Sequence, residues 1–457
     1  MHVNAATIYT TMNIDERIEI VIFNNVNVVE GSTIVFNNNC KQLEIVKSEG
    51  SFDLRPYIGI KYYFGYFTEL KILPGKKSFP NLSSIKLRLF HFMQTVKLPN
   101  IYELIELECI STTEDTEIIL NKACKELRIE SCEGVINGQE IEYLESLHIN
   151  FFRNEKDNIR FIGSIRVNKI YITNICWGTF SIISMLTNFK NIQYIEFKDK
   201  SLLMFLCYPK YLYNSVIRCI TRKKGSKDNS DLLSKLLATT NRDSNTWLEE
   251  VLNIILNFVL RNIMGKGVMD NISELELGHF FIDQDNCKSL KELKNLKILR
   301  IRTRKITNEF FYNLPPNLIL LDITNFAEGE IIDAEKYTIK SSIIVPQHQN
   351  IKILSVNVDF LYNVRYLSVM MPSLDILVVQ YSRSITDYFP MQKSKIKVRE
   401  LLITCNYTNE IMLQEEEMIL FIKNIKFYID FELLKYIEFV SLPVSVFFNP
   451  DTFQVIE

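Results

Sequence analysis

The side chains that most often perform catalysis or bind metal are few and scattered in this sequence. The chain of 457 residues holds 5 histidines and 9 cysteines, which form no H-E-x-x-H pair and no close cluster of cysteine with histidine. Cys124 and Cys132 are too far apart for a C-x-x-C zinc motif. The sequence therefore predicts no metal site, and another role is expected for each histidine: His2, His91, His148, His279 and His348.

Motifs for phosphate binding and for activated nucleophiles are also missing. The sequence contains no G-x-x-x-x-G-K-[ST], no G-x-G-x-x-G and no G-x-S-x-G, and it has only 14 glycines with which to build such loops. The carboxylate run from Glu415 to Glu417 is typical of a solvated helix start rather than of an acid and base pair. We therefore expect a protein that is not an enzyme and that has no cofactor and no catalytic residue.

Two arginines are better candidates, for binding rather than for catalysis. The stretch LRIRTRK covers residues 299–305. If Leu299 and Ile301 point into a core, Arg300 and Arg302 lie side by side on the open face of the same strand. A guanidinium in that position can bind a carboxylate or a phosphate through two parallel hydrogen bonds.

The spacing of apolar residues in this stretch recurs along the chain. CKELRI (124–129) has apolar residues at i, i+3 and i+5, and so do LESLHI (144–149), VNKIYI (167–172) and ISELEL (272–277). The last apolar position falls at 107, 129, 149, 172 and 197, and again at 277, 301 and 323, so neighbouring copies lie about 20 to 25 residues apart. A period of this length is typical of solenoids, in which each unit buries its apolar edge against the next.

The pattern resembles the leucine-rich repeat family, whose motif is L-x-x-L-x-L-x-x-[NC]-x-L. Cys132 and Asn406 occupy the ninth position of their copies, whereas Phe280, Phe326 and Ile175 stand there in others. The resemblance implies an α/β fold: a curved parallel β-sheet with a helical or irregular backing. The departures at the ninth position predict irregular repeats without the usual polar ladder in the turns.

The period is lost between Phe197 and Leu277. WLEEVLNIILNFVLRNIM (247–264) has the apolar spacing of a helix, so the sequence predicts an N-terminal repeat arm (1–200), a helical insertion (201–271) and a C-terminal repeat arm (272–457). Polar residues interrupt the helix too often for a membrane span. It either packs on its own solenoid or pairs with another chain, in which case Ile255 and Phe258 are the expected oligomer contacts.

The same alternation predicts which side chains lie on the open face of the sheet. Their charges are mixed: Lys71, Lys86, Arg88, Arg128, Lys198, Arg300 and Arg302 are basic, and Glu106, Glu108, Glu130, Glu196, Glu276 and Asp322 are acidic. A face for nucleic acid should be mainly basic, so this face suits a protein with its own charge pattern, unless the charges are merely solvated. The expected partner-binding residues are Arg128, His148, Tyr171, Arg300 and Arg302.

Composition agrees with a folded chain that binds protein. The apolar fraction is 47% and the formal net charge is -2, so no general attraction to nucleic acid or anionic membranes is expected. The first residues show no secretory signal and the cysteines are odd in number, which favours a cytoplasmic or nuclear location and reduced, buried thiols. We expect a scaffold that binds protein partners; the alternatives are a structural homo-oligomer, or an adaptor subunit of a ubiquitin ligase or ribonucleoprotein complex.

Overall fold

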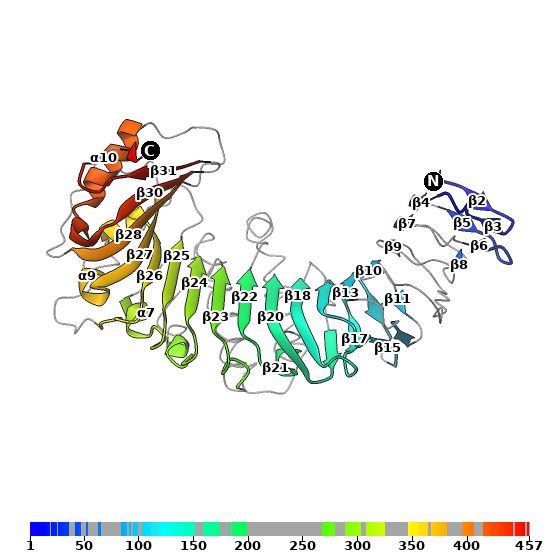
Figure 1. Ribbon diagram of the computed structural model, residues 1–457. Helices are drawn as coiled ribbons and strands as arrows, with labels where there is room; N and C mark the ends of the chain where they lie inside the picture. The colour runs from blue at the N-terminus through cyan, green and yellow to red at the C-terminus, as the bar shows by residue number, and fades with distance from the viewer. Residues whose placement is uncertain are drawn as a thin grey trace, which may run out of the picture. The chain divides into compact units, whose positions relative to one another are not determined.

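The computed structural model shows a β-solenoid of about 8 turns whose strands are mostly parallel (Figure 1). The chain forms two compact units: unit 1 is Met1–Ser234 with Gly265–Val268, and unit 2 is Lys235–Met264 with Met269–Glu457. The structure describes residues 1–18, 20–24, 26–35, 42–46, 52–53, 63–64, 84–88, 91–92, 95–98, 103–113, 115–150, 159–173, 182, 185–198, 267–278, 288–302, 308–324, 346–363, 367–381, 395–405, 415–441, 444–452 and 455–456.

The main sheet of unit 1 consists of strands that pair in parallel, one turn after another. They are β9 (Tyr63–Phe64), β10 (Ser84–Arg88), β13 (Leu104–Glu108), β16 (Glu126–Glu130), β18 (Tyr143–Asn150), β20 (Ile165–Thr173), β21 (Phe189–Lys190) and β22 (Tyr194–Lys198). Three small parallel sheets precede them: β1 (His2–Asn4), β4 (Ile20–Asn24) and β7 (Gln42–Val46); β2 (Thr7–Ile8) and β5 (Asn27–Val28); β3 (Met12–Asn13), β6 (Ile34–Val35) and β8 (Phe52–Asp53).

Side chains of the main sheet alternate between the core and the open face, as the repeat predicts. In the copy CKELRI the side chains of Cys124, Leu127 and Ile129 are buried, while Arg128 is exposed. The next copy repeats this, with Leu147 and Ile149 buried. Each strand therefore adds two inward-pointing residues to a continuous core, and burying an aliphatic side chain stabilises a fold by roughly 1.5 to 3 kcal/mol.

A second parallel sheet lies behind the main sheet in unit 1. It contains β12 (Val96–Lys97), β15 (Glu117–Ile119), β17 (Gly134–Asn137) and β19 (Ile159–Ile162), with the pair β11 (His91–Phe92) and β14 (Ser111–Thr112) beside it. Where the family resemblance implies helices or irregular segments, this part of the backing is therefore made of strands. Short runs such as EII and GVIN are rich in β-branched residues, which favour strands.

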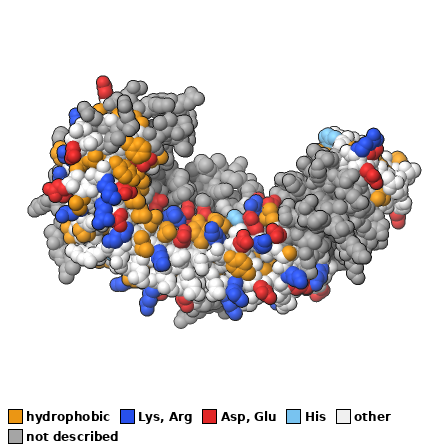
Figure 2. All heavy atoms as spheres, in the orientation of Figure 1, with side chains coloured by type: hydrophobic (Ala, Val, Ile, Leu, Met, Phe, Trp, Pro, Cys, Tyr) orange, Lys and Arg blue, Asp and Glu red, His pale blue; other side chains and the backbone are white. Residues whose placement is uncertain are grey.

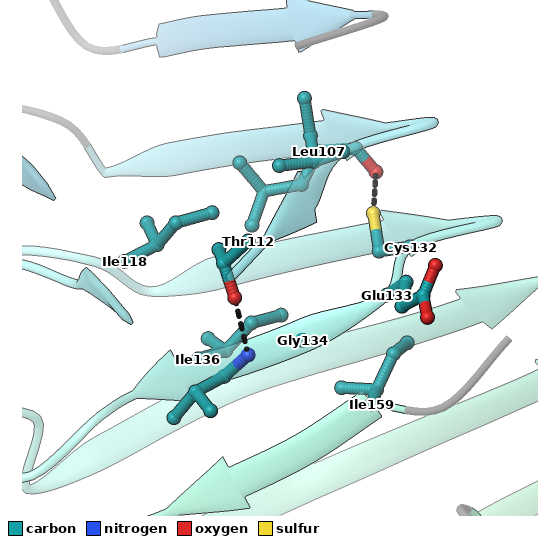
Figure 3. A pocket seen from close by; sticks show the side chains of 10 residues that line it. Leu107, Thr112, Ile118, Cys132, Glu133, Gly134, Ile136 and Ile159 are labelled. Carbon is teal, nitrogen blue, oxygen red and sulfur yellow. Dashed lines mark hydrogen bonds between the residues drawn. The ribbon is translucent and has the colours of Figure 1, made fainter. Parts of the chain in front are cut away.

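Side chains from both sheets meet in one tightly packed interior (Figure 3). Leu107 of the main sheet and Ile118, Ile136 and Ile159 of the second sheet enclose a space too small for a water molecule. Cys132, at the ninth position of its copy, donates its S–H to the Leu107 carbonyl oxygen at 3.3 Å. The thiol thus ties one turn to the turn before it, and the space offers no room for a ligand.

The buried thiols have structural roles. Cys124 and Cys132 are buried thiols, whereas Cys109 is a thiol that is partly exposed. Burial raises the pKa of the Cys124 thiol to about 12, and its Sγ lies 3.3 Å from the carbonyl oxygen of Glu126. The neutral thiol therefore persists throughout the ordinary pH range.

Unit 2 has the same main-sheet architecture with different connections. Its parallel strands are β23 (Glu274–Gly278), β24 (Ile298–Arg302), β25 (Leu320–Thr324), β26 (Ile353–Asn357), β27 (Ser373–Tyr381), β28 (Ile396–Cys405), β29 (Ile429–Asp430) and β30 (Tyr436–Ser441). Between them lie α7 (Asn308–Tyr312), α8 (Val358–Asn363), α9 (Leu367–Met370), α10 (Glu415–Ile425) and the 3-10 turn η4 (Phe431–Leu433). Of the helices in the described ranges, α10 alone is longer than six residues.

Residues 201–266 of the predicted helical insertion lie outside the described residues, and so do Ile255 and Phe258. The predicted division into an arm, an insertion and a second arm therefore stays a prediction. A continuous helical backing stays one as well, because the described helices of unit 2 are short.

Asparagines form a polar ladder between turns of unit 2. Each precedes the first buried residue of its copy and donates its side-chain amide to a carbonyl of the preceding turn: Asn295 to Asp270 (2.6 Å), Asn317 to Lys294 (2.8 Å) and Asn350 to Pro316 (2.9 Å). The expectation that the turns lack a polar ladder is thus too broad. The ladder exists, but at a different position of the repeat.

The C-terminal end of unit 2 reverses the direction of the sheet. β31 (Val444–Phe448) pairs antiparallel with β30, and β32 (Val455–Ile456) pairs antiparallel with β31. Phe448 is buried and its ring packs against Phe439 with centroids 5.5 Å apart. The apolar residues that follow the last repeat therefore extend and cover the last parallel strand.

A substitution at Gly134 can test how closely the turns of unit 1 are packed. Its φ of +113° is strained for other residues, and a β-carbon there would lie 2.0 Å from Oγ1 of Thr112, which accepts a hydrogen bond from the backbone N–H of Val135. Gly134→Ala should therefore lower the free energy of unfolding by more than about 2 kcal/mol in urea denaturation, because clash adds to strain. Gly31→Ala is the control: its φ is +87° with nothing within 4 Å, so only about 1 kcal/mol should be lost. Equal losses would contradict the clash.

The asparagine ladder makes a separate prediction. Asn350→Ala removes one hydrogen bond between turns and should lower the free energy of unfolding by about 1 kcal/mol, measured by urea denaturation. The neighbouring Gln349 is exposed and donates its side-chain amide to the Gln347 side chain at 3.4 Å, within the same turn, so Gln349→Ala should change stability by less than about 0.5 kcal/mol. If the two variants unfold at the same urea concentration, the ladder does not stabilise the solenoid.

Candidate functional site

Three of the five predicted partner-binding residues lie next to one another on the open face of unit 1. Strand register places Arg128 of β16 opposite His148 of β18, and His148 opposite Tyr171 of β20. Glu106 of β13 and Glu196 of β22 continue the same row on either side. Parallel pairing therefore collects side chains that are far apart in sequence, since each strand contributes one residue to the row.

Arg128 binds two carboxylates from neighbouring strands. Its Nη1 lies 3.0 Å from Oε1 of Glu106, and its Nη2 lies 2.7 Å from Oε1 of Glu126. Burial lowers the pKa of Arg128, but the hydrogen bonds and charges of the two carboxylates outweigh it and raise the pKa above its usual value. Because the Arg128 side chain is 49% exposed, these pairs contribute little to stability and mainly hold the three side chains in place.

Aromatic rings continue the arrangement beyond Arg128. The rings of His148 and Tyr171 are stacked, with centroids 4.3 Å apart and 7° between their planes, and Tyr194 lies 5.3 Å from Tyr171. The Tyr194 hydroxyl lies 2.9 Å from Oε2 of Glu196. We name these seven residues the open-face cluster: Glu106, Glu126, Arg128, His148, Tyr171, Tyr194 and Glu196.

The imidazole of His148 is neutral near pH 7. Burial lowers its pKa, the nearby Glu126 raises it and Arg128 lowers it, with a net shift below the usual value. Nε2 of His148 lies 3.5 Å from Oε1 of Glu126. A neutral ring stacked on a tyrosine presents an apolar face with hydrogen-bonding nitrogens at its edge, which suits recognition of another protein.

The part of the face around the open-face cluster is acidic. In the three outward rows that contain the open-face cluster, the described side chains from β13 to β22 include five carboxylates, of which Glu196 is buried, and two basic groups: Glu106, Glu108, Glu126, Glu130, Glu196, Arg128 and Lys169. The exposed Arg166 of β20 and Lys190 of β21 lie in another row. Charged side chains of both signs gather over these strands in Figure 2. This local excess of carboxylates favours a basic partner surface, and it disfavours the phosphate backbone of a nucleic acid.

The other two predicted partner-binding residues, Arg300 and Arg302, belong to unit 2. Arg300 is partly exposed, and its Nη1 is 3.4 Å from Oε2 of Glu274. Arg302 pairs with Thr324 through the backbone, and its side chain is outside the described part of the structure. Within unit 2, therefore, Arg300 contributes to a separate charged pair.

Two groups of residues on the open faces were missed in the sequence analysis. Glu126 and Tyr194 complete the open-face cluster, and a row of aliphatic side chains crosses unit 2: Ile298, Leu320, Ile353 and Ile376, here named the aliphatic row. All of them occupy one position of the repeat, directly before the second buried residue. Comparing this position across copies could have found them, because it is polar or aromatic on β16 to β22 of unit 1 and aliphatic on β24 to β27 of unit 2.

The described residues include no group of three or more His, Cys, Asp or Glu side chains that could hold a metal ion. No described helix is long and apolar enough to cross a membrane. No protein-family model matches the chain, and no curated protein matches it. The case for a function therefore depends on the geometry of the open faces.

His148 provides a direct test of the open-face cluster. Its titration midpoint, followed through the imidazole C–H signals by NMR, should lie below 6.5. Glu126→Gln should lower the midpoint further, since it removes a carboxylate that favours the imidazolium, whereas Arg128→Gln should raise it by removing a nearby positive charge. His348, whose Nε2 lies 2.7 Å from the Phe311 carbonyl oxygen, is an internal control that neither variant should shift. If a variant shifted the midpoints of His148 and His348 together, His148 would not be sensing these charges.

Proposed function

We propose that this chain is a non-enzymatic scaffold of the leucine-rich repeat type that binds a protein partner through the open face of unit 1. The observation that carries the proposal is the open-face cluster, in which stacked aromatic rings lie beside carboxylates. Aromatic side chains supply most of the binding energy at many interfaces, and fixed charges select the partner. We place the protein in the cytoplasm, with the nucleus as the alternative, because its scattered cysteines, odd in number, favour a reducing compartment.

Each member of the cluster has a role in the proposed mechanism. The His148 and Tyr171 rings are stacked face to face and the Tyr194 ring is tilted against Tyr171, so the three rings offer mainly their edges to the apolar groups of a partner. Arg128 holds Glu106 and Glu126 in place, so that carboxylate oxygens border this surface. A partner segment that carries arginine or lysine beside apolar residues would complement both features.

Exposed apolar residues near the C-terminus favour a homo-oligomer as the second candidate. Five large apolar side chains that are more than a third exposed lie between residues 420 and 455: Leu420, Phe427, Leu433, Phe447 and Val455. Such residues are typical of surfaces that associate with another chain. The adaptor hypothesis for a ubiquitin ligase or ribonucleoprotein complex has no such support, and the acidic face argues against direct RNA binding.

The scaffold proposal predicts a loss of affinity when the aromatic surface is removed. A protein captured by the immobilised chain should be purified and its Kd measured by isothermal titration calorimetry. Tyr171→Ala should weaken binding about tenfold or more, because truncating a central aromatic contact costs more than 1 kcal/mol. The control is Tyr143→Ala, which removes a 47% exposed tyrosine of the same sheet outside the cluster and should leave the Kd unchanged.

Two further measurements complete this experiment. Glu106→Gln with Glu126→Gln should weaken binding and reduce its dependence on salt, because the partner is expected to be basic. Light scattering of the purified chain over a range of concentrations tests the second candidate. A multimer that persists in the Tyr171→Ala variant and dissociates in Phe427→Asp would overturn the scaffold proposal and establish self-assembly.

A further inference from the structure

The aliphatic row makes the open face of unit 2 unlike that of unit 1. Strand register pairs Ile298 with Leu320, Leu320 with Ile353, and Ile353 with Ile376, so four aliphatic side chains stand side by side on β24 to β27. All four are partly exposed, although they point away from the core. In the described part of unit 1, the same repeat position holds one aliphatic residue, Leu104 of β13, followed by Glu126, Ser146, Lys169 and Tyr194 on β16 to β22.

The apolar surface is wider than one row and has polar ends. Val378 of β27 and Leu402 of β28 pair with each other in the next row of the same face, and both are partly exposed. Strand register places Glu274 beside Ile298 at one end of the aliphatic row and Glu400 beside Ile376 at the other. A limited apolar patch with a polar border is typical of a binding site for another chain.

A line of mainly basic side chains runs along one side of the aliphatic row. Each residue directly precedes a residue of the row or of its continuation in β28 and β30, and we name this line the basic edge: Lys297, Ile319, Lys352, Asp375, Arg399 and Lys435. Four of its members are basic, one is acidic, and all but Asp375 are exposed. Figure 2 shows hydrophobic side chains with Lys and Arg beside them on this part of the molecule.

The basic edge reaches the border of the open face. Nζ of Lys435 lies 3.8 Å from Oε1 of Glu400, which continues the aliphatic row. Arg399 pairs with Asp375 at 3.2 Å but remains 61% exposed. Lys297 and Lys352 form no ion pair with the described residues. A carboxylate placed over the aliphatic row could therefore pair with Lys297 and Lys352, which have no acidic partner among the described residues.

From this geometry we infer that the aliphatic row and the basic edge together bind an acidic amphipathic helix of a partner protein. Neighbouring strands are about 4.8 Å apart, so the row offers one aliphatic side chain every 4.8 Å or so. A helix lying along it presents one apolar side chain per turn of about 5.4 Å, and its glutamates or aspartates on one flank face the basic edge. An extended segment repeats at about 6.7 Å on one face and matches the row less well.

The proposed helix is short. The four aliphatic residues span three strand spacings, or about 14 Å, which corresponds to roughly 10 helical residues. The inference goes beyond the proposed function of unit 1, because it involves a different surface, other residues and a partner of opposite charge. Variants of the open-face cluster should leave it unaffected, so the two proposals can fail separately.

The test measures binding of a synthetic helical peptide of 15 residues that has leucine once per turn and glutamate along one flank. Fluorescence anisotropy with the full chain compares it with a peptide in which lysine replaces glutamate and with a scrambled peptide of the same composition. The acidic helix should bind at least about tenfold more tightly than either. Ile353→Gln with Ile376→Gln should weaken it about tenfold, and so should Lys297→Glu with Lys352→Glu, whose side chains are exposed and should not disturb the fold.

Lys291→Glu is the matched control, since Lys291 is exposed in the same unit and lies outside the basic edge. It should change the affinity by less than about twofold. Equal binding of the glutamate and lysine peptides, an acidic peptide that does not bind, or affinity that survives both double variants would overturn the inference. So would a dimer in light scattering that Ile353→Gln with Ile376→Gln dissociates, because the occupant would then be a second copy of this chain.

Discussion

Parallel strand pairing in constant register is the constraint on which the rest of this structure depends. In both units each main-sheet strand repeats the position of its neighbour, so equivalent residues of successive copies stand in rows. Leu127, Leu147 and Ile170 form one buried row, and Arg128, His148 and Tyr171 form one outward row. A shift by one residue would bury the charges and expose the aliphatic side chains. Burial of the inward rows in the core therefore fixes the register that lines up the outward residues.

One position of the repeat then decides what each unit offers to other molecules. In unit 1 it holds Glu126 and Tyr194, which join a cluster of carboxylates and stacked rings. In unit 2 it holds Ile298 and Ile353, whose row lies beside lysines and arginine. The same backbone thus carries two surfaces of opposite chemical preference, one acidic and aromatic, the other aliphatic and basic. A scaffold built this way can distinguish partners by charge without any change of fold.

The i, i+3, i+5 spacing was sufficient to predict the solenoid, the buried positions and the place of Arg128, His148 and Tyr171 on the open face. It did not predict the second sheet of unit 1, because runs as short as EII and GVIN carry too few residues to show a period. The asparagine ladder was missed because the family motif directs attention to the ninth position, whereas Asn317 precedes the first buried one. Contacts such as Tyr194 to Glu196 depend on side-chain rotamers, which no repeat pattern specifies.

The antiparallel end of unit 2 has a consequence for solubility. A parallel solenoid leaves a row of unpaired backbone N–H and C=O groups on its last strand, where the strand of another molecule could add and start a fibre. Here β31 occupies that row beside β30, and the two-residue strand β32 pairs with β31 in turn. The antiparallel strand at Val444 to Phe448 therefore hinders the addition of other molecules to β30.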